Sequence, residues 1–433
     1  MGARRTFLFV TWEGGGNVPP VLGLAKKMID RGHCVVVLGE PCLRHRVMSI
    51  GAKFIAFTAG LTRERAEDVL LQDWRYRTPP AALKHTMDVL MFGQSMTIAQ
   101  QVSDALVSTG ADVLVADWLL PCALIPAEAR GVPSVALVHC INMLPGPGKP
   151  SAGMLPARGA IGRLRDQAVA RLMNYIADGF LSDVNATRAE FGVGPLTHSF
   201  ELFERATRIL VQSSEAFDFP ITPSPKNLRY VGPCLDDPAD APNKEISEIS
   251  GILNDNRSIV VASLSTTFQN QAGKLQMIIS ALGKVRDATD QPVRAIVTAG
   301  PVMRDVEFQK PENVTVVHSA PHSLLFPYAA AFITHCGHGS VMRALSHGVP
   351  LIALPMGRDQ EDTAARIVAR GVGVRPKARV ASVVSAVNDV VNNTRYTQAA
   401  RDISVLLKAE AAANLDVAEL EALTVPAKRR LDD

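Results

Sequence analysis

Short apolar runs alternate with stretches of helical periodicity along almost the whole chain. The first example is complete: an apolar run at 6–11, a Gly- and Pro-rich loop at 12–20, an amphipathic stretch at 21–31 and a second apolar run at 34–38. Uninterrupted apolar runs are typical of parallel strands that are buried on both faces, and helices connect such strands. The pattern therefore predicts an α/β fold built from strand–helix–strand units.

The same pattern divides the chain into two halves. In the first half, further strands are predicted at 113–116, 134–138 and 208–212, with long helical stretches at about 82–108 and 161–190. A segment rich in Pro, Asp and Asn follows, without apolar periodicity, and is typical of a linker between domains. In the second half, strands are predicted at 258–264, 293–299, 314–317, 330–334 and 350–354.

We therefore expect two domains and a cleft between them, in which ligands bind at the carboxyl ends of the strands. The predicted boundaries are 1–233 for the first domain, 234–246 for the linker, 247–393 for the second domain, 394–424 for terminal helices and 425–433 for a tail.

Composition narrows the class of protein and of partner. Of 433 residues, 47% are hydrophobic and 20% are charged, which is a globular and not a disordered balance. The 45 basic and 42 acidic residues leave a net charge of +3, too little to hold a nucleic-acid backbone or an anionic membrane surface. The sequence therefore predicts a small-molecule ligand and no nucleic-acid partner.

The cysteines and the apolar runs bear on location. The six cysteines are scattered without a C-x-x-C pair, which indicates reduced thiols and a cytoplasmic protein. No apolar run reaches the roughly 18 residues of a membrane span, so we expect no stable membrane insertion. The oligomeric state is left open, with a homodimer as one option.

The motif HCGHGS at 335–340 lies between a predicted strand and a predicted helix. Free N–H groups and the dipole at a helix amino terminus attract a phosphate, and the two glycines allow its close approach. Ser340 and His335 could donate hydrogen bonds to the same group. One alternative is an ordinary turn with a satisfied histidine. A metal site of His335, Cys336 and His338 is disfavoured, because neighbouring side chains in a tight turn converge poorly.

A second polar pair, Asp359 and Gln360, follows the predicted strand at 350–354. Paired hydrogen-bonding side chains at the end of a strand suit the neighbouring hydroxyls of a sugar. The alternative is that Asp359 merely caps the next helix.

The run from 318 to 373 combines HCG-x-GS, GVP, P-x-G-x-DQ and A-x-R. This combination resembles the signature region of nucleotide-sugar glycosyltransferases of the GT-B fold, a family that includes macrolide and aglycone glycosyltransferases of bacteria and plant secondary-product glycosyltransferases. The resemblance extends more weakly over nearly the whole chain. It implies two Rossmann-like domains that face each other across a cleft, with the acceptor in the first domain, the donor in the second and terminal helices that cross back.

The resemblance also assigns the donor site. Arg343 is a departure, because many relatives carry a ribose-binding glutamate at this place. Donor binding is implied for His335 with the backbone of Gly339 and Ser340 at the diphosphate, Asp359 and Gln360 at the sugar, His322 near the pyrimidine base, Ser263 and Thr266 in a donor loop, and Arg343 at the ribose or a phosphate. Members of this kind transfer without a divalent metal, and no cofactor is expected.

The first loop, GGGNVPP, is similar to the family's glycine-histidine-x-x-proline loop, but Asn17 stands where the catalytic histidine belongs. An amide cannot act as a general base. Asp117 occupies the place of the aspartate that assists this histidine, and its position after an apolar strand predicts partial burial. We therefore expect Asp117 to accept the proton and Asn17 to orient the acceptor hydroxyl. His139 is the second candidate base, and each of these strand-end residues could instead be structural.

The expected function is that of an inverting, metal-independent glycosyltransferase. It would move a sugar from a dTDP- or UDP-linked donor to a small hydrophobic acceptor, a polyketide or aromatic aglycone, through an O- or C-glycosidic bond. Because Asn17 replaces the histidine, a non-catalytic nucleotide-binding or auxiliary protein is the alternative. A third reading is an epimerase that acts on the nucleotide sugar itself.

Overall fold

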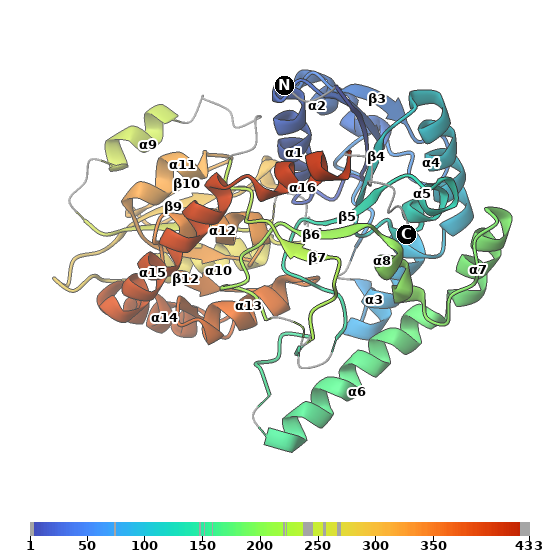
Figure 1. Ribbon diagram of the computed structural model, residues 1–433. Helices are drawn as coiled ribbons and strands as arrows, with labels where there is room; N and C mark the ends of the chain where they lie inside the picture. Colours follow the sequence, from blue (N-terminus) through green and yellow to red (C-terminus); the bar gives the residue numbers. More distant parts are fainter. Residues whose placement is uncertain are drawn as a thin grey trace.

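The computed structural model describes residues 4–72, 75–146, 149–150, 152–157, 159–219, 221, 223–236, 246–253, 257–265 and 270–424. The described residues form two fully parallel sheets, which lie side by side (Figure 1). The first sheet has the order β3 (Lys53–Ala56), β2 (Cys34–Gly39), β1 (Thr6–Val10), β4 (Val113–Asp117), β5 (Ser134–Val138), β6 (Arg208–Val211), β7 (Leu228–Tyr230). The second has the order β10 (Val314–Val317), β9 (Arg294–Thr298), β8 (Ile259–Ser263), β11 (Ala329–Thr334), β12 (Leu351–Ala353), β13 (Gly373–Val374).

Helices cover both faces of each sheet, which explains the uninterrupted apolar runs. Along β1, Phe7 and Phe9 enter one core and Leu8 and Val10 enter another, because successive side chains of a strand point to opposite faces. The helices of the first half are α1 (Val18–Asp30), α2 (Arg44–Ser49), α3 (Pro79–Thr86), α4 (Ser95–Thr109), α5 (Leu124–Arg130), α6 (Gly159–Asp178), α7 (Leu181–Glu190) and α8 (Leu202–Arg205). The later helices are α9 (Ile246–Leu253), α10 (Ala272–Leu282), α11 (His322–Leu325), α12 (His338–Ser346), α13 (Gln360–Ala369), α14 (Val380–Asn392), α15 (Thr394–Ala412) and α16 (Leu415–Leu423).

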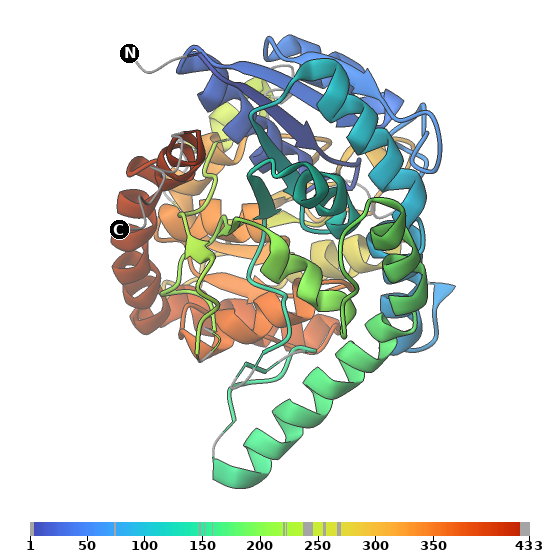
Figure 2. The same ribbon diagram turned by 45° about the vertical axis from the view of Figure 1, so that its right-hand side comes forward.

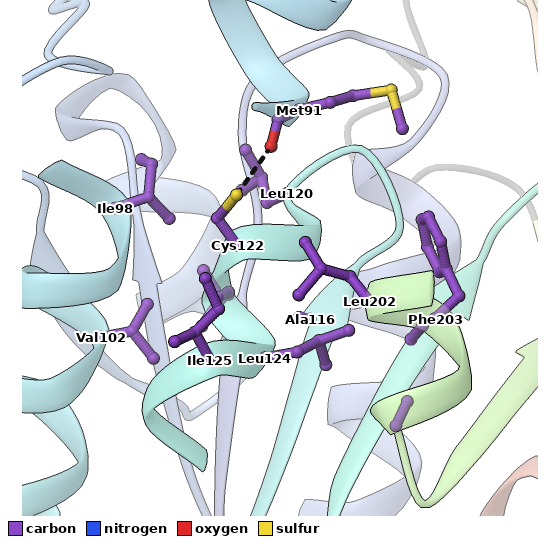
Figure 3. Close-up of a cluster of buried hydrophobic side chains, with 14 of the residues drawn as sticks. Met91, Ile98, Val102, Ala116, Leu120, Cys122, Leu124, Ile125, Leu202 and Phe203 are labelled. Carbon is purple, nitrogen blue, oxygen red and sulfur yellow. Dashed lines mark hydrogen bonds between the residues drawn. The ribbon is translucent and has the colours of Figure 1, made fainter. Parts of the chain in front are cut away.

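One of these cores lies between the first sheet and helices α4, α5 and α8 (Figure 3). Ile98 and Val102 of α4 pack toward Ile125 of α5 in this core. The Cys122 thiol donates a hydrogen bond to the carbonyl oxygen of Met91 over 3.1 Å, and burial raises the pKa of this thiol. Cys122 therefore behaves as a core residue, in agreement with the prediction of unpaired thiols.

The last two helices connect the two halves (Figure 1). Helix α15 packs on α12, and α16 lies against α1 of the first half. Ion pairs hold this contact, with 2.9 Å between Arg31 Nε and Glu421 Oε1 and 3.3 Å between Lys27 Nζ and Asp416 Oδ2. The described part of the chain therefore returns to the first half.

The predicted α/β fold is confirmed, and the predicted strands of both halves correspond to strands in the structure. Three strands are not predicted: β3, β7 and β13, which have four, three and two residues and are too short to show a period. The long stretches predicted at 82–108 and 161–190 are helical, and each is divided into two helices. The first breaks after α3 through a π-type turn over Met87–Met91 before α4 begins, and the second breaks at Gly179 between α6 and α7.

Candidate active site

Each sheet reverses its strand order at one place, and the candidate residues gather there. In the first sheet the reversal lies between β1 and β4, and in the second it lies between β8 and β11. Connections on the two sides of such a point leave toward opposite faces, which opens a crevice at the carboxyl ends of the strands. In the first sheet, Asn17 lies after the loop that follows β1, and Asp117 ends β4. In the second sheet, Ser263 ends β8, and His335 directly follows β11.

Asn17, at the start of α1, is tied to its own loop and to Asp117. Its Nδ2 donates to the carbonyl oxygen of Trp12 over 2.8 Å and to Asp117 Oδ2 over 2.9 Å, and its Oδ1 accepts from the N–H of Gly14 over 3.0 Å. A Cβ on Gly14 would come within 2.8 Å of Asn17 Oδ1, so this close turn requires glycine. Both amide protons of Asn17 are therefore used within the protein, and the side chain is buried.

Asp117, the last residue of β4, has four polar neighbours. Its Oδ2 accepts from Asn17 and, over 3.4 Å, from Thr11 Oγ1; its Oδ1 accepts from the N–H of Leu119 over 3.0 Å. His139, directly after β5, brings its Nε2 to 3.3 Å from Asp117 Oδ1, but the two atoms form no hydrogen bond. Asp117 is completely buried, more so than the partial burial predicted, and the second candidate base lies beside it.

A buried ion network holds the first loop in this position. Glu40 accepts from the N–H of Glu13 over 2.7 Å and from Arg63 Nε over 2.7 Å. Glu13 accepts from the N–H of Gly15 over 2.7 Å and from Arg46 over 3.1 Å. Burial raises the pKa of Glu13, and the neighbouring arginines oppose that rise. Because these contacts span the loop, its backbone is fixed before any ligand binds.

In the second half, His335 directly follows β11 and packs on the turn that begins α12. A Cβ on Gly337 would lie 2.5 Å from His335 Nε2, so the imidazole requires glycine at this position. Burial lowers the pKa of His335 to about 4, and a contact with the backbone of Ser263 opposes that shift. The imidazole is therefore neutral at neutral pH and can donate one hydrogen bond.

The first turn of α12 brings a helix amino terminus and a cationic side chain together. Gly339 and Ser340 lie in this turn and are partly exposed. Arg343 folds back toward it, with its Nη1 3.4 Å from the position of a Cβ on Gly339, and the same Nη1 donates to the carbonyl oxygen of Asp236 over 3.3 Å. His338 points the other way: its Nε2 lies 3.1 Å from the carbonyl oxygen of Gln212, at the end of β6.

Asp359 and Gln360 lie where β12 leads into α13. Asp359 makes no side-chain capping hydrogen bond, so the alternative reading of this residue as a helix cap is not supported. Burial raises the pKa of Asp359, and the nearby His139 and Arg358 oppose that rise. Gln360 Oε1 accepts from the N–H of Met356 over 2.8 Å, which fixes its amide. Arg358, which no sequence motif singled out, is a cation in the loop just before Asp359, and its Nη2 donates to the carbonyl oxygen of Leu71 over 2.9 Å.

Of the other predicted donor residues, His322 lies away from the strand-reversal point and Ser263 lies at it. His322 begins α11 and packs on aromatic rings, with its centroid 4.7 Å from that of Phe326 and 5.7 Å from that of Phe332. Ser263 ends β8 opposite Thr334 of β11. Thr266 lies outside the described residues.

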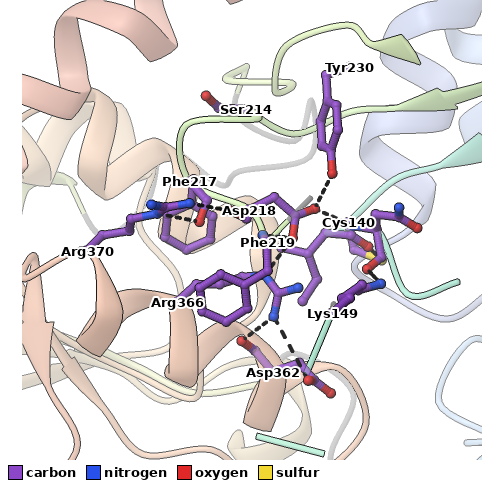
Figure 4. Close-up of polar contacts among 12 residues, drawn as sticks. Cys140, Lys149, Ser214, Phe217, Asp218, Phe219, Tyr230, Asp362, Arg366 and Arg370 are labelled. Atoms are coloured by element: carbon purple, nitrogen blue, oxygen red, sulfur yellow. Dashed lines mark hydrogen bonds and ion pairs between the residues drawn. The ribbon is translucent and has the colours of Figure 1, made fainter. Parts of the chain in front are cut away.

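A buried polar cluster joins the two domains next to these sites (Figure 4). Arg366 of α13 pairs with Asp218 of the first half over 2.7 Å, and both side chains are fully buried. Asp218 Oδ2 also accepts from the N–H of Asn142 over 2.7 Å and from the Tyr230 hydroxyl over 3.1 Å. The Arg366 guanidinium lies 4.4 Å from the ring centroid of Phe219. The cluster therefore fixes α13, and with it Asp359, relative to the first domain.

The described residues lack two kinds of feature. No group of three or more His, Cys, Asp or Glu side chains in this part of the chain is arranged to hold a metal ion. None of the helices described is both long and apolar enough to cross a bilayer.

Comparison with known proteins agrees with this geometry. Residues 20–420 match the family model described as "UDP-glucoronosyl and UDP-glucosyl transferase". The chain is 28% identical over 421 residues to 4'-demethylrebeccamycin synthase of Lentzea aerocolonigenes, which covers 92% of this chain and 93% of that protein.

Solved structures show the same fold. The calicheamicin glycosyltransferase CalG4 superposes with a TM-score of 0.72 at 19% identity, over 97% of this chain and 98% of that one. The glycosyltransferase VinC in complex with dTDP superposes with a TM-score of 0.70 at 17% identity, over 97% and 99%. The predicted GT-B fold is confirmed. The chain therefore belongs to the UDP-glucuronosyl and UDP-glucosyl transferase family and is a nucleotide-sugar-dependent glycosyltransferase.

Proposed function

We propose that this glycosyltransferase moves a sugar, with inversion at the anomeric carbon, from a dTDP- or UDP-linked donor to a hydroxyl of a small hydrophobic natural product. The observation that carries the proposal is the juxtaposition of two different sites. A carboxylate with an imidazole and an amide lies at the reversal point of one sheet, and a helix amino terminus with a neutral histidine lies at that of the other.

The second site suits a diphosphate. The N–H groups and dipole of α12 favour negative charge, and His335 and Arg343 adjoin that helix end. We propose that Asp359 and Gln360, next to the cation Arg358, form hydrogen bonds with the sugar hydroxyls. We propose that the α12 terminus, His335 and Arg343 stabilise the negative charge of the leaving diphosphate without a divalent metal.

The names of the relatives support the classes of donor and acceptor. Rebeccamycin and calicheamicin stand in the names of two similar proteins, and a third was solved with dTDP. A polyketide or aromatic aglycone fits this set. An oxygen acceptor is favoured, because the first site offers a proton acceptor; a ring carbon activated by a phenolate is the alternative. A purely auxiliary role is disfavoured, because the chain retains a carboxylate–imidazole pair at this site.

The experiment that tests this function is incubation of the protein with UDP-glucose or dTDP-glucose and a panel of polyketide and aromatic aglycones. We expect release of the nucleoside diphosphate together with an acceptor whose mass has increased by one sugar. Conversion of the nucleotide sugar without any acceptor would indicate an epimerase. Nucleotide binding without turnover across the panel would indicate an auxiliary protein.

A further inference from the structure

We propose that His139 is the catalytic base of this glycosyltransferase and that Asp117 and Asn17 are positioning residues. The inference rests on the proposed function and corrects the expectation that Asp117 receives the proton and Asn17 orients the acceptor. The histidine that the family carries in the first loop would thus be replaced by one at the end of β5, on the other side of the same aspartate.

Exposure separates the two candidates. The His139 side chain is 11% exposed, whereas the Asp117 side chain has no exposed surface. A base must come within about 3 Å of the hydroxyl whose proton it takes. The acceptor can reach His139 at the crevice, but it can reach Asp117 only if the packed side chains around the carboxylate move.

The contacts of Asp117 also favour a positioning role. One carboxylate oxygen accepts from Asn17 and Thr11, and the other accepts from the N–H of Leu119 and faces His139 Nε2. The carboxylate therefore has partners at both oxygens and is held in one orientation. The negative charge of this carboxylate, 3.3 Å from His139 Nε2, favours a proton on that nitrogen and leaves Nδ1 as the acceptor, although no hydrogen bond joins the two side chains.

The free side of the imidazole supports this assignment. Within the part of the chain that the structure describes, no hydrogen bond to His139 Nδ1 is seen. The ring lies at the seam between the domains, because its charge acts on both Asp359 and His338 of the second half. His139 therefore lies near Asp359, one of the two residues proposed to hold the donor sugar.

The transfer step then balances without a further reactant. The acceptor oxygen forms a bond to the anomeric carbon while the bond from that carbon to the diphosphate oxygen breaks, and its electron pair leaves with the diphosphate. The hydroxyl proton passes to His139 Nδ1. The resulting imidazolium is stabilised by the Asp117 carboxylate 3.3 Å away, and the proton is later released to water.

The test compares His139→Gln and His139→Ala with a matched control, His33→Gln. His33 is also a partly buried histidine next to a strand, but it precedes β2, at the amino ends of the strands, and lies 3.3 Å from Glu421. Each variant is assayed with UDP-glucose and dTDP-glucose and two acceptors that share one ring system, 2-naphthol and 2-naphthylmethanol. Affinity for UDP and dTDP is measured in parallel.

We expect His139→Gln to lose about 10²–10⁴ in rate on 2-naphthylmethanol, the usual contribution of a general base. The loss should be much smaller on 2-naphthol, because a phenol gives up its proton more readily. Added imidazole should restore part of the activity of His139→Ala but not of Asp117→Asn. Nucleotide affinity should stay close to that of the wild type in every variant, and His33→Gln should turn over normally.

Two results would overturn the inference alone: equal turnover by wild type and His139→Gln, or a loss that is the same for both acceptors and is not rescued by imidazole. Absence of transfer by the wild type, across these acceptors and the aglycone panel, would overturn the proposed function and the inference together.

Discussion

The two strand-reversal points hold their polar groups in different ways. At the second sheet, the groups come from two short segments, 335–343 and 358–360, and the backbone of one helix supplies most of the hydrogen-bond donors. At the first sheet, Asn17, Asp117 and His139 come from three separate strand ends, and each touches a neighbour through its side chain. A local backbone site tolerates little change in sequence. A side-chain site needs only an imidazole next to a fixed carboxylate, and more than one strand can supply it.

The largest effect is expected from Asp117→Asn, which leaves the shape of the first site unchanged and removes its charge. We expect turnover to fall by about 10²–10⁴, because the imidazolium loses its stabilising partner. Steady-state rates and isothermal titration with UDP measure the two sites separately. The matched control is Asp112→Asn, at the other end of β4, where Asp112 pairs with Arg5. Full activity of Asp117→Asn would remove the carboxylate from the mechanism.

The equivalent change at the second site is His335→Ala. Removal of one hydrogen-bond donor to a leaving group typically costs on the order of 10² or more in rate. Here we expect weaker binding of UDP or dTDP as well as slower transfer, in contrast to Asp117→Asn. The control is His347→Ala, at the exposed far end of the same helix. Unchanged nucleotide affinity and turnover in His335→Ala would show that the donor lies elsewhere.

His338 lies three residues from His335, and we expect it to stabilise the fold and not to bind the donor. Burial lowers the pKa of His338 to about 4 in the folded protein, against an ordinary value of 6.5. The unfolded chain therefore binds more protons between these pH values, and the stability that His338 contributes above pH 6.5 is lost as the pH falls toward 4. The full contribution is about 3 kcal/mol.

Urea unfolding at pH 7 and pH 4.5 measures this dependence. His338→Gln should show a smaller loss of stability at acid pH than the wild type, with nucleotide affinity little changed. An identical loss in the two proteins would contradict the assignment.

Asn17→Asp tests whether Asn17 acts through Asp117. The change removes the Nδ2 donor and places two carboxylates side by side, which disfavours the ionised form of both. A hydrogen bond to a charged group contributes about 1.5–3 kcal/mol, so turnover should fall by about 10- to 100-fold, with unchanged nucleotide affinity. The loss should be similar for alcohol and amine acceptors of one size. A loss confined to one acceptor would instead place Asn17 in contact with the substrate.

The smallest effect is expected from removal of divalent metals. The helix terminus, Arg343 and Arg358 supply positive charge next to the proposed diphosphate site, so turnover in excess EDTA should equal turnover in its absence. Strict dependence on Mg²⁺ or Mn²⁺ would show that this charge is insufficient and would assign Asp359 to a metal.

The contrast between the two sites also explains what the sequence could predict. The HCGHGS turn and the Asp359–Gln360 pair are local, so their placement at a helix start follows from the neighbouring strand and helix alone. The pairing of Asp117 with His139 depends on which strands are neighbours, and apolar runs do not give that order. In the structure, Asp117 lies opposite Leu137 in the register of β4 and β5, which brings His139 into reach. The contacts of Arg366 with Asp218 and of Arg358 with Leu71 depend on how the domains meet, for which single-chain patterns hold no signal.

The most direct test of the central claim is a crystal structure with UDP or dTDP and an aglycone bound together. The account predicts the diphosphate at the amino terminus of α12 beside His335, and the acceptor hydroxyl about 2.6–3.2 Å from a ring nitrogen of His139. A hydroxyl hydrogen-bonded to Asp117 or Asn17, with His139 turned away from the acceptor, would contradict it.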